Sequence, residues 1–186
     1  MRIVRVTQPL DYFINPSLVD WKLRVGKAEA GKISRAAMKV GTRVDELIKT
    51  GEAPIVKDKP EVHSAHRAFK KWVEVYKPES IVVQTRSNRE CEGVELSGEP
   101  DIMALDTLID IKCAGRISLS YWLQLAAYAW LKDWTGNIAV LRLDKKTESF
   151  EYVVKPFDEK LLSVYMGVLR AFVYYTEGED ESDVEL

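Results

Sequence analysis

The sequence lacks most features that mark disulfide-rich, iron–sulfur or membrane proteins. Its two cysteines, Cys91 and Cys113, are too few for a disulfide framework, a four-thiolate zinc site or a four-cysteine iron–sulfur cluster. No stretch approaches eighteen consecutive apolar residues, and the N-terminal residues lack the apolar core and cleavage site of a signal peptide. We therefore expect a cytoplasmic protein without a membrane partner and without an iron–sulfur cluster.

The composition that remains is that of an ordinary globular domain. Hydrophobic residues make up 46% and charged residues 30% of the 186 positions, with only 10 Gly and 7 Pro. No internal repeat, low-complexity linker or shift in composition indicates a domain boundary. We expect one domain over residues 1–176, with a helical N-terminal part at 1–51, followed by an acidic, disordered tail at 177–186.

Charge is distributed unevenly along the chain. Residues 1–76 carry fifteen Lys and Arg against nine Asp and Glu, whereas residues 77–186 carry twelve against twenty. Six of these acids lie in the last ten residues. A basic half beside an acidic pocket suits a polyanionic substrate held over a cation, although scattered solvated charge explains the same counts equally well.

Apolar spacing predicts helices in the N-terminal part and strands after it. Between Ser17 and Gly51 apolar residues recur every three or four positions, which predicts two or three helices joined at glycines. Another helix should begin at Pro60 and end before Pro78. Branched residues then predict strands that the polar segment at 87–93 should interrupt. The predicted strands are 80–85, 93–105, 107–113, 137–143 and 149–154, and the later predicted helices are 118–133 and 157–175.

This order of elements predicts a mixed α/β fold. Helices come first, followed by three strands, a helix, two strands and a last helix. Such an order is typical of a sheet with helices packed on its faces. We therefore expect a central mixed sheet flanked by helices, preceded by an N-terminal helical segment.

The segment GEPDIMALDTLIDIKCA, residues 98–114, predicts a hairpin that brings two acids together. If Leu105 and Asp106 form the turn, symmetric pairing places Asp101 opposite Asp110 on one face, with Cβ atoms about 5 Å apart. Two carboxylates at that distance need a shared proton or a cation between them. The register decides this prediction, because a slip of one residue would send Asp101 to the other face.

Lys112 adds a basic group to the same face. Strand periodicity directs Asp110 and Lys112 to one side and Ile109 and Ile111 into the core. Paired carboxylates suit Mg²⁺, which keeps several waters and meets substrate phosphates. A lysine whose pKa is depressed by burial and a nearby cation can orient or deprotonate a metal-bound water. The pattern predicts metal-assisted phosphodiester hydrolysis, whereas a lone D-x-K motif is usually an exposed charge pair.

The predicted helix at 118–133 carries a polar row beside an apolar stripe. Positions three and four apart share a helical face, so Tyr121, Gln124, Tyr128 and Lys132 should lie on one side. A row of this kind suits ligand binding, because a face turned to water would hold more charge and fewer aromatic rings. The expected core stripe on the other side consists of Leu119, Trp122, Leu123, Ala126, Ala127 and Trp130.

Together these motifs resemble the PD-(D/E)xK nuclease superfamily and, within it, the RecB-like and phage exonuclease-like branch. The motifs span about thirty residues, and the order of helices and strands extends the resemblance over most of the chain. The family often has Thr or Ser where Cys113 stands, and many members have an acid where Gln84 stands. The matching residues, in order, are Pro100 and Asp101, then Asp110, Ile111 and Lys112, then Gln124 and Tyr128.

The resemblance implies a restriction-endonuclease-like αβββαβ core whose hairpin holds Mg²⁺, for which Mn²⁺ substitutes. An upstream acid usually completes the site, and the local candidate is Asp45 with Glu46 beside it. A place in the first turn of a helix, behind a cap at Thr42, explains Asp45 as well. The implied metal ligands are Asp101, Asp110 and the Ile111 carbonyl, Lys112 assists the attacking water, and Gln124 and Tyr128 organise the site and contact the nucleic acid.

The resulting hypothesis is a metal-dependent deoxyribonuclease, either an exonuclease or an endonuclease, acting on single- or double-stranded DNA in repair or recombination. Small stand-alone members of the family are common in viruses, in which case the location is the host cytoplasm. The alternatives are a nuclease-like fold that only binds nucleic acid or a partner, and a scaffold subunit. Further DNA contacts are expected at Tyr121, Arg116 and Lys132, and weaker phosphate contacts at Lys70, Lys71, Arg86 and Arg89.

Overall fold

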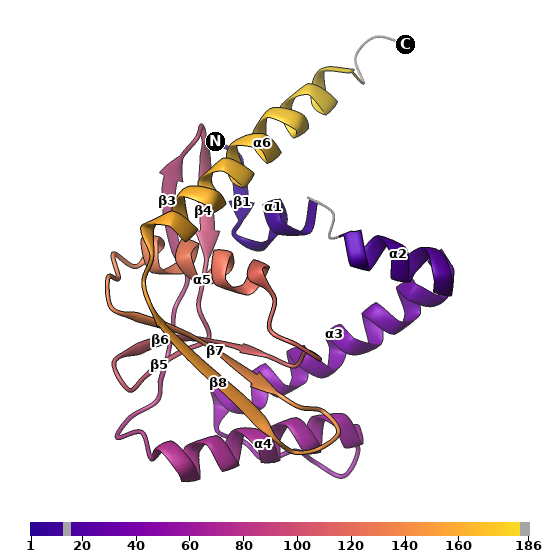
Figure 1. The fold of residues 1–186 in the computed structure, drawn as a ribbon, viewed down its shortest axis with the longest axis vertical. Helices are drawn as coiled ribbons and strands as arrows, with labels where there is room; N and C mark the ends of the chain where they lie inside the picture. The colour runs from indigo at the N-terminus through magenta and orange to yellow at the C-terminus, as the bar shows by residue number, and fades with distance from the viewer. Residues whose placement is uncertain (13–15, 183–186) are drawn as a thin grey trace.

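The computed structural model describes residues 1–12 and 16–182, of which 16–19 and 178–182 by their backbone alone. The helices and strands form two sheets with helices around them (Figure 1). The elements are, in order, β1 (Ile3–Arg5), α1 (Thr7–Tyr12), α2 (Pro16–Val25), α3 (Lys27–Thr50), α4 (Pro60–Tyr76), β2 (Val82–Val83), β3 (Ser87–Cys91), β4 (Val94–Gly98), β5 (Ile102–Ala104), β6 (Thr107–Lys112), α5 (Leu119–Leu131), β7 (Asn137–Leu143), β8 (Phe150–Pro156) and α6 (Glu159–Ser182).

The central sheet is mixed, as predicted. Its five strands lie in the order β2-β5-β6-β7-β8, and only β6 and β7 are parallel. Helix α5 connects these two strands, because parallel neighbours need a crossover rather than a tight turn. A separate sheet has the order β1-β4-β3, with β1 parallel to β4. The fold is therefore mixed α/β with a mixed sheet flanked by helices.

Helices cover both faces of the five-stranded sheet (Figure 1). Helices α5 and α6 pack on one face together with Leu108, whereas α3 and α4 pack on the other face together with Ile109. Both residues belong to β6 and are at most 1% exposed. The prediction that only the Ile109 side of this strand faces a core was therefore wrong. Asp110 projects from a strand that is covered on both sides.

Several predicted boundaries differ from the structure. The segment expected as one strand at 93–105 is two strands, β4 and β5, which lie in different sheets. Residues 99–101 between them carry Asp101. The segment 87–93, expected to interrupt strands, contains β3 itself, which pairs with β4 at the edge of its sheet. Its polar sequence suits this place, because exposed and half-buried side chains alternate along it.

The helical predictions were closer to the observed elements. Helix α4 begins at Pro60 and ends at Tyr76, as expected, and Gly26 and Gly51 flank α3. Helix α5 is buried on nearly all sides, and Leu119, expected in its core stripe, is 64% exposed. Strand β1 and helix α1 were not expected at all.

The last helix is longer than the sequence indicated. Helix α6 runs to Ser182, past Tyr175, and so enters the segment 177–186 that was expected to be disordered. Residues 183–186 of that segment lie outside the described residues. Among the described residues, no helix combines the length and the apolar character needed to cross a membrane.

Candidate active site

The hairpin of β5 and β6 has the predicted turn and register. Leu105 and Asp106 have φ angles of 55° and 49°, the left-handed values of a two-residue turn that suits the twist of paired strands. Ile102 pairs with Ile109, at the end of the hairpin next to the acids. Asp101 precedes this pair, and its Oδ2 accepts the backbone N–H of Ile111 at 2.6 Å. The hairpin therefore holds Asp101 against the strand that carries Asp110.

Both acids are removed from water. Asp110 is 1% exposed, and the side chain of Asp101 is 18% exposed. Burial raises the pKa of Asp110 above its ordinary value. Burial and, second, the charge of Asp110 raise the pKa of Asp101. Two carboxylates that resist joint ionisation create a demand for positive charge between them.

Lys112 supplies one positive charge. Its Nζ lies 2.9 Å from Oδ2 of Asp110 and donates a hydrogen bond to Oδ1 at 3.1 Å. Burial favours the neutral amine, but the charges of Asp110 and Asp101 outweigh it, so the pKa of Lys112 lies above its ordinary value. Nζ also lies 5.3 Å from the ring centre of Tyr121. Without a bound cation, Lys112 is held as the ammonium that balances the acids.

The polar row of α5 faces the acids. Gln124 and Tyr128 are 7% and 6% exposed. The side-chain amide of Gln124 donates to Asp110 Oδ1 at 3.4 Å and to the Tyr128 hydroxyl at 2.6 Å. The ring of Tyr128 packs against Gly98, where an added Cβ would lie 2.6 Å from a ring carbon. Gln124 therefore links an acid of β6 to a tyrosine whose place depends on a glycine in β4.

Helix α3 brings a third acid and a second lysine to the site. Oδ2 of Asp45 lies 2.9 Å from Lys49 Nζ, while its Oδ1 is buried and has no hydrogen-bond partner among the described residues. The same Nζ lies 3.9 Å from Asp101 Oδ1 and 3.8 Å from Glu99 Oε1. The alternative that placed Asp45 in a first helical turn was wrong, because α3 begins at Lys27.

These groups line a pocket of about 340 Å³. Glu46 does not line it and pairs with Arg43 instead, at 3.3 Å. Arg116 is exposed outside the pocket. Lys132 Nζ donates to the Thr85 carbonyl at 2.5 Å and is also outside it. The predicted site residues that do line the pocket are Asp45, Asp101, Asp110, Ile111, Lys112, Tyr121, Gln124 and Tyr128.

Two charged groups at the edge of the site were missed by sequence reasoning. Lys49 follows Asp45 by four positions, a spacing that places both on one helical face and that was readable from the sequence. Glu99 stands two positions before Asp101, and Arg86 Nε lies 3.7 Å from its carboxylate. No sequence pattern marked Glu99, because its contact with Lys49 joins elements about fifty residues apart.

The donor set fits a hard divalent cation. Carboxylate oxygens are the ligands that Mg²⁺ prefers, and Asp45 Oδ1 is a buried acceptor without a donor. Asp110 Oδ2 also lacks a hydrogen bond of acceptable geometry, although Lys112 lies beside it. Among the described residues, no group of three or more His, Cys, Asp or Glu side chains forms a ready metal cage. A site with two carboxylates, a carbonyl and water suits Mg²⁺, which keeps much of its hydration.

The comparisons with known proteins reach this chain through its fold. No family model and no curated protein matches the sequence. The alkaline exonuclease LHK-Exo from Laribacter hongkongensis is similar in fold, with a TM-score of 0.55 and 14% identity over 96% of this chain and 90% of that chain. Its complex with dAMP gives 0.54 and 15% over the same shares. A putative exonuclease from Eubacterium rectale gives 0.55 and 16%, covering 80% of this chain and 69% of that one.

Proposed function

We propose that the protein is a metal-dependent deoxyribonuclease of the PD-(D/E)xK type. The observation that carries the proposal is the pocket in which buried Asp110 meets Asp101, Lys112 and Gln124. The fold supports it, because the similar structures include exonucleases, one of them in complex with dAMP. The motif order from Asp101 to Tyr128 supports the assignment to this superfamily.

In this proposal, the carboxylates of Asp101 and Asp110 and the carbonyl of Ile111 would hold Mg²⁺ or Mn²⁺. The cation supplies charge neutralisation at the scissile phosphate and lowers the pKa of a water. The backbone N–H of Ile111 fixes Asp101 through its bond to Oδ2, which leaves Oδ1 for other ligands. Burial of both acids keeps competing water away from their oxygens.

The remaining residues orient the reacting groups. Lys112, as an ammonium beside Asp110, donates hydrogen bonds to the attacking water and to a phosphate oxygen. Gln124 holds the carboxylate of Asp110 in one orientation. Tyr128, which accepts the second bond of Gln124, keeps its own O–H available for the DNA backbone. Asp45 and Lys49 balance the charge at the α3 side of the pocket.

The test is cleavage of end-labelled linear and circular DNA by the purified protein, with Mg²⁺ or with EDTA. Asp110→Asn should lower Mg²⁺-dependent cleavage by about a thousandfold or more, since it removes a buried anionic ligand. Asp106→Asn is the matched control, because Asp106 lies in the turn of the same hairpin and Asn tolerates its positive φ. Products from circles would identify an endonuclease.

Two results would refute the proposal. One is cleavage by Asp110→Asn at the rate of the unmodified protein, and the other is cleavage that EDTA leaves unchanged. Salt-sensitive DNA binding with no product under any metal would instead favour the alternative of a binding module without catalysis.

A further inference from the structure

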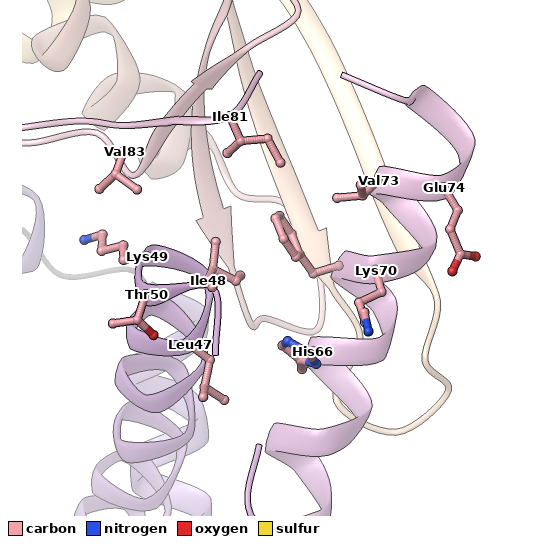
Figure 2. Close-up of a pocket in the computed structure, with 12 residues that line it drawn as sticks. Leu47, Ile48, Lys49, Thr50, His66, Lys70, Val73, Glu74, Ile81 and Val83 are labelled. Carbon is pink, nitrogen blue, oxygen red and sulfur yellow. The ribbon is translucent and has the colours of Figure 1, made fainter. Parts of the chain in front are cut away.

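A second pocket lies beside the candidate active site. It has a volume of about 540 Å³ and lies between the C-terminal end of α3 and helix α4, next to β2. Figure 2 shows Ile48 and Lys49 of α3 on one side, Lys70 and Val73 of α4 on the other, and Ile81 and Val83 near the top. We call this pocket the α3–α4 groove. Its size falls in the range of small-ligand sites, about 300–1,000 Å³.

Both walls of the groove end at Asp101. On the α3 side, Lys49 lines the groove, and its Nζ lies 3.9 Å from Asp101 Oδ1. On the β2 side, Val83 lines the groove and pairs with Ile102. The next residue, Gln84, donates its backbone N–H to the Asp101 carbonyl at 3.2 Å. A ligand that extends from the acids past Lys49 therefore enters the groove.

The lining combines apolar walls with positive charge. Phe69 offers an aromatic ring that is half-buried, and Val83 is 40% exposed on the edge strand of the sheet. Lys70 is exposed at the rim and has no ion pair among residues 1–12 and 16–182. Surfaces that hold unpaired nucleotides have this composition, with apolar or aromatic groups for the base and cations for the backbone.

We propose that the α3–α4 groove binds the base of an unpaired nucleotide adjacent to the scissile phosphate, with Lys70 at the flanking phosphate. This inference rests on the proposed function and extends it to the form of the substrate. A base in the groove cannot stay paired, so the site takes a single strand or the frayed end of a duplex. A protein segment or a second copy of the chain would have no need for the unpaired Lys70.

The test uses a groove-filling substitution and a control one residue away. Val83→Trp fills the groove from β2, whereas Val82→Trp places the same ring on the opposite face, because side chains alternate along a strand. Val82 is 44% exposed and does not line the groove. Binding of a labelled single-stranded oligonucleotide is measured in EDTA by fluorescence anisotropy, with an abasic site placed at each position in turn.

For the unmodified protein, one abasic position should weaken binding about tenfold, which is within the range for one stacked base. Val83→Trp should weaken binding of the intact oligonucleotide to a similar extent and abolish the penalty at that position. Val82→Trp should preserve both the affinity and the penalty. Unchanged affinity in Val83→Trp, or equal penalties at all abasic positions, would overturn the proposal, as would a Val83→Trp effect limited to self-association.

A second pair of variants covers the case in which Val83→Trp fails to fold. Lys70→Glu should weaken binding and reduce its salt dependence, whereas Lys71→Glu should change both less, because Lys71 lies 3.7 Å from Glu148 and outside the groove. Equal effects of the two substitutions would count against the groove. Failure here is distinguishable from failure of the proposed function: a protein that cleaves DNA with Mg²⁺ but ignores both groove variants loses only this inference.

Discussion

The two faces of the five-stranded sheet differ in what they bury. The face under α5 holds a buried carboxylate, Asp110, with Gln124 beside it. The face under α4 holds apolar side chains and packed rings, and no charged residue is buried there within the described part of the chain. Strand β6 serves both faces, with Asp110 on one and Ile109 on the other. One strand thus contributes to chemistry and to stability through alternate residues.

Trp72 offers the largest test of this division. It is fully buried in α4, and its ring centre lies 5.6 Å from those of Phe69 and Tyr152. Trp72→Ala should lower the free energy of unfolding by about 3–5 kcal/mol, because it leaves a large cavity. Denaturant unfolding measures the loss. Cleavage per folded molecule should stay near that of the unmodified protein, and a specific loss of cleavage would contradict the division between the faces.

Gly98 tests whether packing on the α5 side sets the geometry of the site. An added Cβ would lie 2.6 Å from the Tyr128 ring and 2.8 Å from a methyl group of Val6. Gly98→Ala should therefore cost about 1–3 kcal/mol of stability and also lower cleavage, since Tyr128 must shift. Melting and kinetics on the same sample measure both effects. Lost stability with intact cleavage would show that the position of Tyr128 is unimportant.

Gln124 should affect cleavage more than folding. Gln124→Leu keeps the volume but removes the donor to Asp110 and Tyr128, and the loss of such a partner typically costs about 10–100-fold. Gln84→Leu is the control, because the Gln84 side chain bonds only its neighbour's carbonyl, that of Val82. Initial cleavage rates at saturating DNA measure the difference. Equal rates for the two variants would remove Gln124 from the site.

Arg116 should give the smallest effect. It is exposed outside the pocket, so Arg116→Ala should change stability by less than about 0.5 kcal/mol. Cleavage should change by less than about threefold, in line with the loss of one exposed charge. Titration of rate against DNA concentration checks this, and a tenfold rise in KM would restore Arg116 as a DNA contact.

The hairpin was predictable because its determinants are local. The symmetric sequence around Leu105 and Asp106 fixes the turn, the turn fixes the register, and the register places Asp101 beside β6. The polar row of α5 was readable for the same reason, since helical spacing alone groups Gln124 with Tyr128. Burial of that row was not readable, because it depends on α6 covering the outer side of α5.

The missed features depend on contacts between distant segments. Strand β3 has a polar sequence and forms because β4 is available as its partner, with Glu90 opposite Glu95. Composition alone therefore favoured a break in the strands at that segment. Lys49 meets Glu99 only when α3 packs beside the hairpin, and no local pattern encodes that approach. The same limit hid the α3–α4 groove.

The contact between Tyr165 and Val6 ties the two ends of the chain to each other. The Tyr165 hydroxyl donates to the Val6 carbonyl at 3.0 Å across 159 positions of sequence, and Val6 in turn packs against Gly98 and so next to Tyr128. Trimming the first six residues or the distal half of α6 therefore alters the support of a tyrosine in the candidate site. Expression boundaries that look dispensable at either terminus are coupled to the chemistry of the protein.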